Sequence, residues 1–478
     1  MDLGQFVGEF ILLFNALAII SIIFFQRRDP SNALPWIIVL FLLPVLGFIL
    51  YLIFGFNYYK KKRFDLKAEA DRAFLERSIE RQSARLTAER QKDLENANIY
   101  ELAMLLLKNS QAVISRKNEV RAFTDGEEKF KAFFEAIESA EHHIHMEYYI
   151  IRDDELGRRT ISLLTKKARE GVRVRLLFDA LGMNIPRSGY QGLVDAGGEV
   201  HAFYKVLIPV LSLRVNYRNH RKILVVDGKV GFLGGYNIGE EYLGRGPLGY
   251  WRDAAVEVRG EGVYGLQLRF ALDWYHATKE YLGDTPEYFP PAPEAGEAFM
   301  QVVSGGPDTR WNPIKEEYLK LIGSAKHTVY LQTPYFIPDE SIIDALRIAA
   351  LSGLDVRIMF PNKPDHPFVY WASYSYVGEL LKAGVRAYTY ENGFIHAKTI
   401  VADDLAASIG TANWDIRSFR LNFETNAVVY HRGFAETQRQ TFLDDLALCK
   451  ELTAEAYARR SLGIRFKEGI SRLFSPVL

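Results

Sequence analysis

A pattern of five residues occurs once in each half of this chain, and it constrains the possible folds more than any other feature. The pattern is a histidine followed by a lysine, an aspartate, a glycine and an asparagine: His220, Lys222, Asp227, Gly234 and Asn237, then His396, Lys398, Asp403, Gly410 and Asn413. The offsets from the histidine are the same in both copies. A single histidine–lysine–aspartate match arises by chance at odds on the order of a few in a hundred. Two copies that also agree on Gly and Asn indicate an internal duplication.

The segments ahead of the two patterns are also similar. Each half has an apolar stretch typical of a buried strand, then a helical pattern, then a second apolar strand: Ala140–Ile150 and Val172–Asp179, then Ala325–Ile337 and Leu354–Pro361. This order predicts a β-α-β unit in each half. Asp125 and Glu128 have the spacing of a capping box for a helix before the first unit.

The duplication predicts an α/β fold with two lobes related by a pseudo-twofold axis. The first lobe covers residues 97–284 and the second covers 298–478. Residues 285–297 between them read TPEYFPPAPEAGE, and their prolines predict a linker. The second lobe ends in a basic, amphipathic segment, Arg459–Leu478. This segment is either an interfacial helix that docks on a bilayer or a terminal helix packed on the second lobe.

The first 59 residues are predicted to be a transmembrane helical hairpin. Two apolar runs cover residues 7–25 and 33–54. At helical rise the second run reaches about 33 Å, which is enough to cross a bilayer core. Pro44 is in the middle of this run and is expected to kink it. A cleaved signal peptide is the alternative for the first run, but no basic residue precedes it and no small-residue cleavage site follows it.

Basic residues beside the apolar runs indicate the side of the membrane. Four cations, Lys60–Arg63, follow the second run, whereas only Arg27 and Arg28 lie between the runs. The positive-inside rule therefore places the lobes in the cytoplasm. Residues 60–96 alternate acidic and basic side chains and predict a charged helical connector.

Composition excludes several classes of protein. The chain has 59 basic and 59 acidic residues, so it is not built as a general nucleic-acid binder. Cys449 is the only cysteine, which excludes an intrachain disulfide and a cysteine-rich metal site. No cluster of acidic metal ligands stands out, and we expect neither a metal nor a cofactor.

The residue types in the repeated pattern fit chemistry on a phosphodiester. His and Lys at positions i and i+2 of a strand point to the same face, so two joined lobes would bring two of each together. One imidazole can attack phosphorus while the other, protonated, donates to the leaving alkoxide. Lys222, Lys398, Asn237 and Asn413 would stabilise the charge on the phosphate oxygens.

The duplicated motif resembles that of the phospholipase D superfamily. The resemblance implies a covalent phosphohistidine intermediate and a pseudo-twofold active site. It also implies that the motif aspartates Asp227 and Asp403 have a structural role, and that a carboxylate further along each half orients a histidine. Glu424 fits this role in the second half and Asp253 in the first. Ordinary salt bridges are the alternative for both carboxylates.

Further segments resemble bacterial cardiolipin synthases of the phospholipase D type, over essentially the whole chain: Tyr51–Gly55, Met146–Ile150, Val302–Asp308, Thr333–Asp339, Gly410–Glu424 and Arg472–Leu478. One departure is Gly235, where the family often has serine; Thr411 keeps a hydroxyl at the matching place. The resemblance implies an enzyme of the bacterial inner membrane that transfers a phosphatidyl group between two phosphatidylglycerol molecules, giving cardiolipin and glycerol. We expect His220 to be the nucleophile and His396 the acid, although the symmetry of the motifs does not decide this.

Other functions fit the same motifs. A hydrolytic phospholipase D would use water as the acceptor and release phosphatidic acid. A membrane-tethered nuclease would profit from a basic groove, which the neutral charge argues against. A non-catalytic scaffold would not need two intact motifs. The sequence leaves open whether the second lipid is phosphatidylglycerol or phosphatidylethanolamine, the acyl-chain preference and the oligomeric state.

Overall fold

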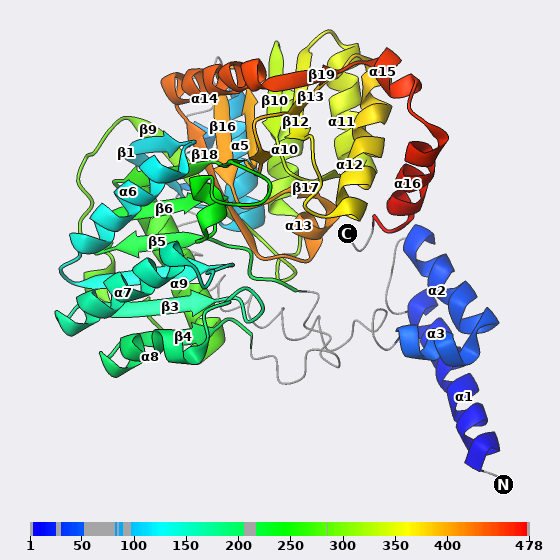
Figure 1. Cartoon of the computed structure of the whole chain (residues 1–478), viewed down its shortest axis with the longest axis horizontal. Helices are drawn as coiled ribbons and strands as arrows, with labels where there is room; N and C mark the ends of the chain where they lie inside the picture. Colours follow the sequence, from blue (N-terminus) through cyan, green and yellow to red (C-terminus); the bar gives the residue numbers. More distant parts are fainter. Residues whose placement is uncertain are drawn as a thin grey trace. The chain divides into compact units, whose positions relative to one another are not determined.

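The computed structural model describes residues 3–24, 30–51, 82–83, 86–88, 97–204, 217–283 and 285–475. The chain forms two compact units. The described part of the smaller unit is the N-terminal helices, and the larger unit contains both predicted lobes (Figure 1). Most of the predicted connector 60–96, including its four-cation cluster, lies outside the described residues.

The N-terminal unit has three helices: α1 (Leu3–Phe24), α2 (Pro30–Leu42) and α3 (Pro44–Leu50). Residues Phe6–Phe24 of α1 form a 19-residue stretch with a mean hydropathy of 2.3, long and apolar enough to cross a membrane. Among the described residues no other helix meets that test. The predicted second span over 33–54 is not confirmed as one membrane-crossing helix, because the described part of it is divided at Leu43, next to the proline where the sequence predicted a kink.

Pro44 explains the interruption. Proline has no backbone N–H, so the carbonyl of Leu40, four residues earlier, loses its helical partner. The Nδ2 group of Asn15 in α1 donates to this carbonyl at 3.2 Å and to the carbonyl of Pro44 at 3.0 Å. Asn15 is buried, whereas most large apolar side chains of the three helices are exposed. The Asn15 amide thus supplies a donor to two backbone carbonyls, while the unit presents apolar groups outward, as lipid requires.

The larger unit is built on one twisted sheet. Its strand order is β19-β13-β12-β10-β15-β16-β18-β9-β1-β8-β6-β5-β2-β3-β4. The strands of the first half are β1 (Ile114–Phe123), β2 (His143–Tyr148), β3 (Arg173–Phe178), β4 (Glu199–Ala202), β5 (Ile223–Val226), β6 (Val230–Gly234), β7 (Trp251–Arg252) and β8 (Ala255–Arg259). Those of the second half are β9 (Ala298–Gly305), β10 (Thr328–Gln332), β11 (Phe336–Ile337), β12 (Asp355–Pro361), β13 (Arg386–Tyr390), β14 (Phe394–Ile395), β15 (Thr399–Ala402), β16 (Ala406–Gly410), β17 (Trp414–Asp415), β18 (Glu424–Tyr430) and β19 (Cys449–Leu452).

The strand order has the predicted pseudo-twofold symmetry. Strands β2 and β3 pair in parallel with α7 (Glu155–Arg169) between them in the chain, and β10 and β12 do so with α11 (Glu340–Leu351) between them. The two predicted β-α-β units are therefore present. Strands β1 and β9 pair antiparallel where the halves meet. The two lobes thus share one continuous sheet.

Helices cover both faces of this sheet (Figure 1). They are α5 (Ala97–Ser110), α6 (Gly126–Glu138), α7 (Glu155–Arg169), α8 (Arg187–Asp195), α9 (Gly262–Thr278), α10 (Pro313–Ser324), α11 (Glu340–Leu351), α12 (Pro367–Leu380), α13 (Ile416–Arg420), α14 (Arg432–Asp445), α15 (Ala454–Ala458) and α16 (Leu462–Leu473). Short 3-10 turns cover Glu240–Leu243, Pro286–Tyr288, Leu381–Ala383 and Leu446–Leu448. Helices α6 and α7 pack on one face of the first half's sheet with Leu224 and Val226 of β5, and α9 packs on the other face with Ile223 and Val225.

Two local details bear on the predictions. The Asp125 side chain accepts a hydrogen bond from the Glu128 backbone N–H at 3.0 Å and caps α6, as the spacing predicted. Helix α5 was expected in the first lobe, but its buried residues pack in the core of the second lobe (Figure 1). A third buried cluster combines residues of both halves on one face of the sheet. This shared core fixes the two halves relative to each other.

Candidate active site

The two motif histidines precede two central strands of the sheet. His220 and Lys222 lead into β5, and His396 and Lys398 lead into β15. Each motif is bonded to the backbone of the other lobe. The His220 N–H donates to the Phe423 carbonyl at 2.9 Å, and the His396 N–H donates to the Arg252 carbonyl at 2.7 Å. Strands β14 and β7 extend the second contact as a short parallel pair.

The two histidine-orienting carboxylates are exchanged between the lobes. The Nδ1 atom of His220 lies 2.9 Å from Oε2 of Glu424, and Nδ1 of His396 lies 2.6 Å from Oδ2 of Asp253. The sequence assigned each carboxylate to the histidine of its own half. That pairing is wrong, because the sheet brings the end of each lobe to the motif of the other lobe. Glu424 and Asp253 are fully buried, so each imidazole is held by a desolvated partner.

Each motif lysine points back at its own histidine. The Lys222 ammonium donates to the His220 carbonyl at 2.6 Å. The Lys398 nitrogen lies 2.8 Å from Nδ1 of His396 and also donates to the His396 carbonyl. All four side chains are buried. Two imidazoles and two ammonium groups are thus collected where the lobes join.

Burial changes the protonation of this group. It lowers the pKa of His220 to about 4, with Glu424 opposing the shift and Lys222 adding to it. It also lowers the pKa of His396 to about 4, where Lys398 adds to the shift and Asp253 opposes it. Burial lowers the pKa of Lys222 to about 7 and that of Lys398 to about 8. An arriving phosphate anion would favour the charged form of all four groups, so ligand binding and protonation are coupled.

The orienting carboxylates stay ionised. Burial tends to raise the pKa of Asp253, but Lys398 and His396 outweigh it and the net pKa lies below the usual range. The same holds for Glu424, where burial is outweighed by His220 and Lys222. An ionised partner can stabilise an imidazolium when a proton reaches the ring.

The two motif asparagines have different surroundings. The Asn237 amide donates to the Tyr242 hydroxyl at 3.0 Å, and this hydroxyl lies 3.3 Å from Nδ1 of His396. Asn413 is buried, and within the described residues its Oδ1 atom has no hydrogen-bond partner. An unpaired buried amide oxygen is costly, so this side chain is suited to a ligand. The predicted phosphate-binding role of both residues stays a prediction.

The motif aspartates lie at the far ends of β5 and β15 from the histidines. The Asp227 carboxylate accepts backbone N–H groups of Glu141, His142 and His143 at 2.8–2.9 Å. Asp403 accepts those of Lys326, His327 and Thr328 in the same way. Both aspartates have a left-handed backbone, with φ of 53° and 50°. Their geometry fits the structural role that the resemblance implied, which is to fix the turns before β2 and β10.

Two neighbours of the histidines, Tyr149 and Arg221, were not predicted from the sequence. The Tyr149 ring meets the His220 ring edge-on at 4.8 Å between centroids. Arg221 is buried between His220 and Lys222, donates to Asp273 and to Thr425, and so ties the first motif to the second lobe. Tyr149 lies in the segment Met146–Ile150 that carries the resemblance, but nothing in its spacing points to His220.

The departure at Gly235 has a steric reason. A Cβ atom at Gly235 would lie 2.1 Å from Oδ1 of Asp253. In the other half the Thr411 hydroxyl donates to Glu424 at 2.5 Å. One half therefore uses a hydroxyl to hold its carboxylate, and the other leaves room for a carboxylate that comes closer to the backbone.

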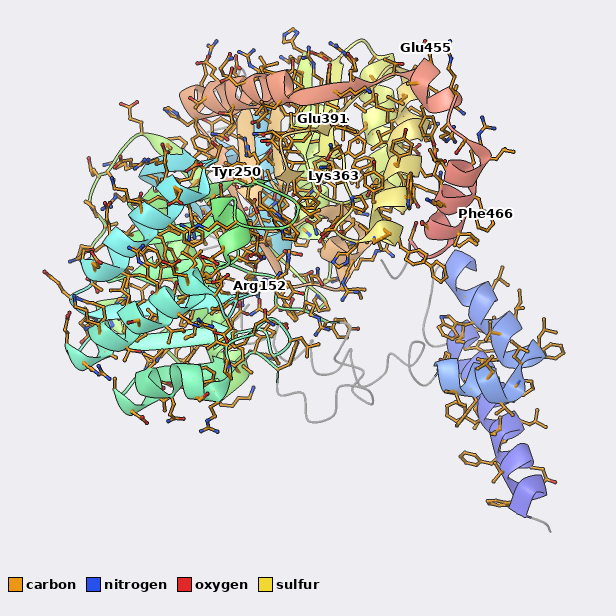
Figure 2. The ribbon with its side chains drawn as sticks, viewed as in Figure 1. Arg152, Tyr250, Lys363, Glu391, Glu455 and Phe466 are labelled. Atoms are coloured by element: carbon orange, nitrogen blue, oxygen red, sulfur yellow. The ribbon has the colours of Figure 1, made fainter. Side chains whose placement is uncertain are left out.

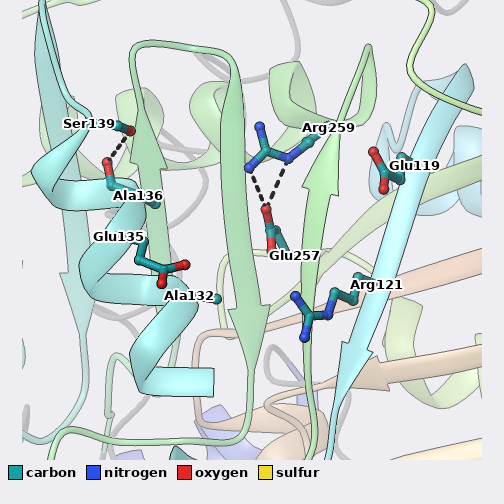
Figure 3. A pocket seen from close by; sticks show the side chains of 8 residues that line it. All are labelled: Glu119, Arg121, Ala132, Glu135, Ala136, Ser139, Glu257 and Arg259. Atoms are coloured by element: carbon teal, nitrogen blue, oxygen red, sulfur yellow. Dashed lines mark hydrogen bonds and ion pairs between the residues drawn. The ribbon is translucent and has the colours of Figure 1, made fainter. Parts of the chain in front are cut away.

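A cavity of about 480 Å³ in the first lobe lies apart from these residues (Figure 3). It is lined by Glu119, Arg121, Ala132, Glu135, Ala136, Ser139, Glu257 and Arg259. Arg259 donates to Glu257 at 2.7 and 3.0 Å, so this cation is already neutralised. The cavity contains none of the motif residues and is not the active site. Among the described residues there is also no group of three or more metal-ligating side chains.

The chain is similar to known proteins over its whole length. The family model described as "Cardiolipin synthase, PLD-like domain" matches residues 133–247 and 318–446, which contain one motif each. A second model, "Phospholipase_D-nuclease N-terminal", matches residues 13–55. The Major cardiolipin synthase ClsA of Bacillus subtilis is 46% identical over 487 residues, covering 100% of both chains. This chain belongs to the phospholipase D-like cardiolipin synthase family.

Other members of the cardiolipin synthase family are equally similar. A cardiolipin synthase of Staphylococcus aureus is 46% identical over 481 residues, covering 99% of this chain and 96% of that one. Among solved structures, the phosphatidylserine synthase of Haemophilus influenzae has a TM-score of 0.58 at 16% identity, over 75% of this chain and 95% of that one. This second likeness supports the fold alone. The family model and the two cardiolipin synthases confirm the predicted family and the phosphatidyltransferase class.

Proposed function

We propose that this enzyme transfers a phosphatidyl group from one phosphatidylglycerol molecule to another, giving cardiolipin and glycerol through a phosphohistidine intermediate. The observation that carries the proposal is the crossed arrangement, in which each motif histidine is held by a carboxylate of the other lobe at 2.9 or 2.6 Å. Two oriented imidazoles beside two lysines match a two-step displacement at phosphorus. The relatives that carry the name cardiolipin synthase support the same product.

In the first step we assign the attack to His220. Its Nε2 forms a bond to phosphorus while the bond from phosphorus to the glycerol oxygen breaks, and His396 gives its proton to that oxygen. In the second step His396 takes the proton of a hydroxyl on the second lipid, whose oxygen displaces His220 from phosphorus. His396 suits the proton role because its contact to Asp253 is the shorter one and the Tyr242 hydroxyl also reaches Nδ1.

Burial of the site favours a lipid acceptor over water. The two histidines are 8% and 6% exposed, and both lysines are buried. A site that restricts water favours transfer, whereas a hydrolytic phospholipase D needs water at the intermediate. The neutral net charge argues against a nuclease.

We also propose that the N-terminal unit anchors the enzyme in the bacterial inner membrane as a multi-pass element, with the catalytic unit in the cytoplasm. The length and apolarity of α1 support the anchor. The side of the membrane rests on the charge count around the apolar runs. In this proposal α2 and α3 together take the chain back across the bilayer.

The test is to give the purified protein phosphatidylglycerol vesicles in the presence of a chelator and to resolve the lipid products. We expect cardiolipin and an equal amount of glycerol, both lost in His220→Ala and His396→Ala. Labelled phosphatidyl trapped on the protein in His396→Ala, and not in His220→Ala, would support the assignment of the nucleophile. Phosphatidic acid as the sole product would identify a hydrolase instead, and turnover only with added phosphatidylethanolamine would change the second substrate.

A further inference from the structure

Helix α16 packs on the second lobe with its polar side. It lies against α12, and its buried residues are Glu468 and Ser471, followed by Ser475 just beyond its end. Glu468 accepts from Arg460 at 2.7 Å and from the Tyr457 hydroxyl at 3.3 Å. The Ser475 hydroxyl is bonded to the Tyr376 hydroxyl at 3.2 Å. Specific polar contacts therefore hold this helix in place.

The apolar side of α16 faces outward. Leu462, Phe466 and Leu473 are 80%, 70% and 76% exposed, and Ile470 and Phe474 are exposed as well. Their spacing of three or four residues puts them on one side of the helix. Figure 2 labels Phe466 on the outer side of α16 (Figure 2). A surface helix normally buries such a stripe, so the orientation is the reverse of the ordinary one.

A neighbouring helix extends this surface. Phe368, at the start of α12, is 53% exposed, and its ring meets the Phe474 ring edge-on at 6.0 Å. We call these six exposed side chains the C-terminal ridge: Leu462, Phe466, Ile470, Leu473, Phe474 and Phe368. Its members come from two elements that are fixed to each other, so the ridge is a preformed surface.

Basic residues outnumber acidic ones around the ridge, although Arg472 pairs with Glu379 of α12 at 2.7 Å. The stretch 459–474 has five basic residues and one acidic residue, Glu468, which is buried and paired with Arg460. Arg465 and Lys467 are exposed beside the apolar stripe, and the Lys467 ammonium lies 5.0 Å from the centre of the Trp371 ring. Exposed cations that flank large apolar side chains are the signature of a helix lying in the interface of an anionic bilayer.

We infer that the C-terminal ridge inserts into the anionic surface of the bilayer that holds α1, as a second membrane attachment of the catalytic unit. A lipid surface matches both the apolar stripe and its cationic border, whereas a second copy would bring the same positive charge against itself. Because α1 belongs to the same chain, a bilayer is always within reach of the ridge. The inference depends on the anchor and not on the reaction.

A site-specific fluorescence measurement tests this. Cys449, the only cysteine, is replaced by Ser, and Phe466→Cys carries an environment-sensitive dye. The full chain is reconstituted in nanodiscs of phosphatidylserine and phosphatidylcholine that contain a spin-labelled lipid. The matched control is Thr437→Cys, an exposed position on α14, which packs on the face of the second lobe's sheet opposite α12. Leu462→Cys serves as a second ridge position if the first does not reconstitute.

We expect a blue shift and quenching by the lipid label at the ridge, several-fold stronger than at Thr437 and reduced in discs of phosphatidylcholine alone. We also expect the ratio of activity in vesicles to activity in detergent to fall several-fold in Leu462→Ser/Phe466→Ser/Leu473→Ser, and to be kept in Phe466→Trp. Equal quenching at both positions would overturn the inference. Quenching of the ridge by a spin-labelled second copy or by a label on α1, with no effect of labelled lipid, would also overturn it.

Discussion

At the scale of single residues, the catalytic character of this site comes from which carboxylate each histidine meets. Glu424 and Asp253 lie far along the chain from His220 and His396, and each pair crosses between lobes. The carboxylates raise the histidine pKa against the effect of burial. Removing either negative charge should therefore lower the pKa of the histidine that it contacts.

The pH profiles of two isosteric variants should distinguish the acid from the nucleophile. In Asp253→Asn the pKa of His396 falls by about 1–3 units. A general acid works while protonated, so the loss of activity at high pH should move to lower pH. In Glu424→Gln the pKa of His220 falls. Because a nucleophile works while deprotonated, the loss of activity at low pH should move to lower pH. Initial rates in mixed micelles measure both limbs, and an exchange of the two results would reverse the roles.

Gly235 gives a second residue-level prediction. A side chain there would meet Asp253 Oδ1 at 2.1 Å, so Gly235→Ala and Gly235→Ser should both displace the carboxylate from His396. A displacement of this size costs up to about 10²-fold in rate. The rate is measured alongside the melting temperature, with Thr411→Ser as the control because it keeps a hydroxyl for Glu424. Full activity in Gly235→Ser with loss in Gly235→Ala would contradict the prediction. It would mean that Asp253 can accept a hydrogen bond from a serine hydroxyl at this position and that the steric contact is relieved.

At the scale of elements, the second apolar run shows how one residue divides a helix. Pro44 leaves the Leu40 carbonyl without its helical N–H, and Asn15 supplies the missing donor from α1. The sequence predicted the kink from Pro44 but could not predict the partner. The hydrogen-bond partner of an amide side chain in an apolar helix depends on how the neighbouring helix packs, and the local sequence does not show that.

Asn15 and Pro44 should therefore be energetically coupled. Asn15→Ala should destabilise the N-terminal unit by about 1 kcal/mol, the usual scale for such bonds in lipid. In Pro44→Ala the restored N–H can serve Leu40, so Asn15→Ala should cost less in that background. Unfolding of the wild type, the two single variants and the double variant in mixed detergent micelles completes the double-mutant cycle. Additive effects would show that Asn15 does not substitute for the lost backbone bond.

At the scale of the whole molecule, much of the fold could be predicted from the repeated sequence. The parallel pairs β2–β3 and β10–β12 and the cap at Asp125 follow from local patterns, which the sequence shows directly. The exchange of Asp253 and Glu424 could not be predicted, because it depends on how the two halves join. The place of α5 and the reversed face of α16 depend in the same way on tertiary contacts rather than on periodicity.

The exchanged carboxylates also limit how such a protein can have arisen. A single ancestral lobe would have carried a histidine and a carboxylate that could not serve each other. It would have needed a second copy of itself before either histidine was oriented. Fusion of two copies made that encounter permanent and let the two halves diverge, as Gly235 and Thr411 have done. It also made the two halves evolve together, because a change in the carboxylate of one half alters the histidine of the other half.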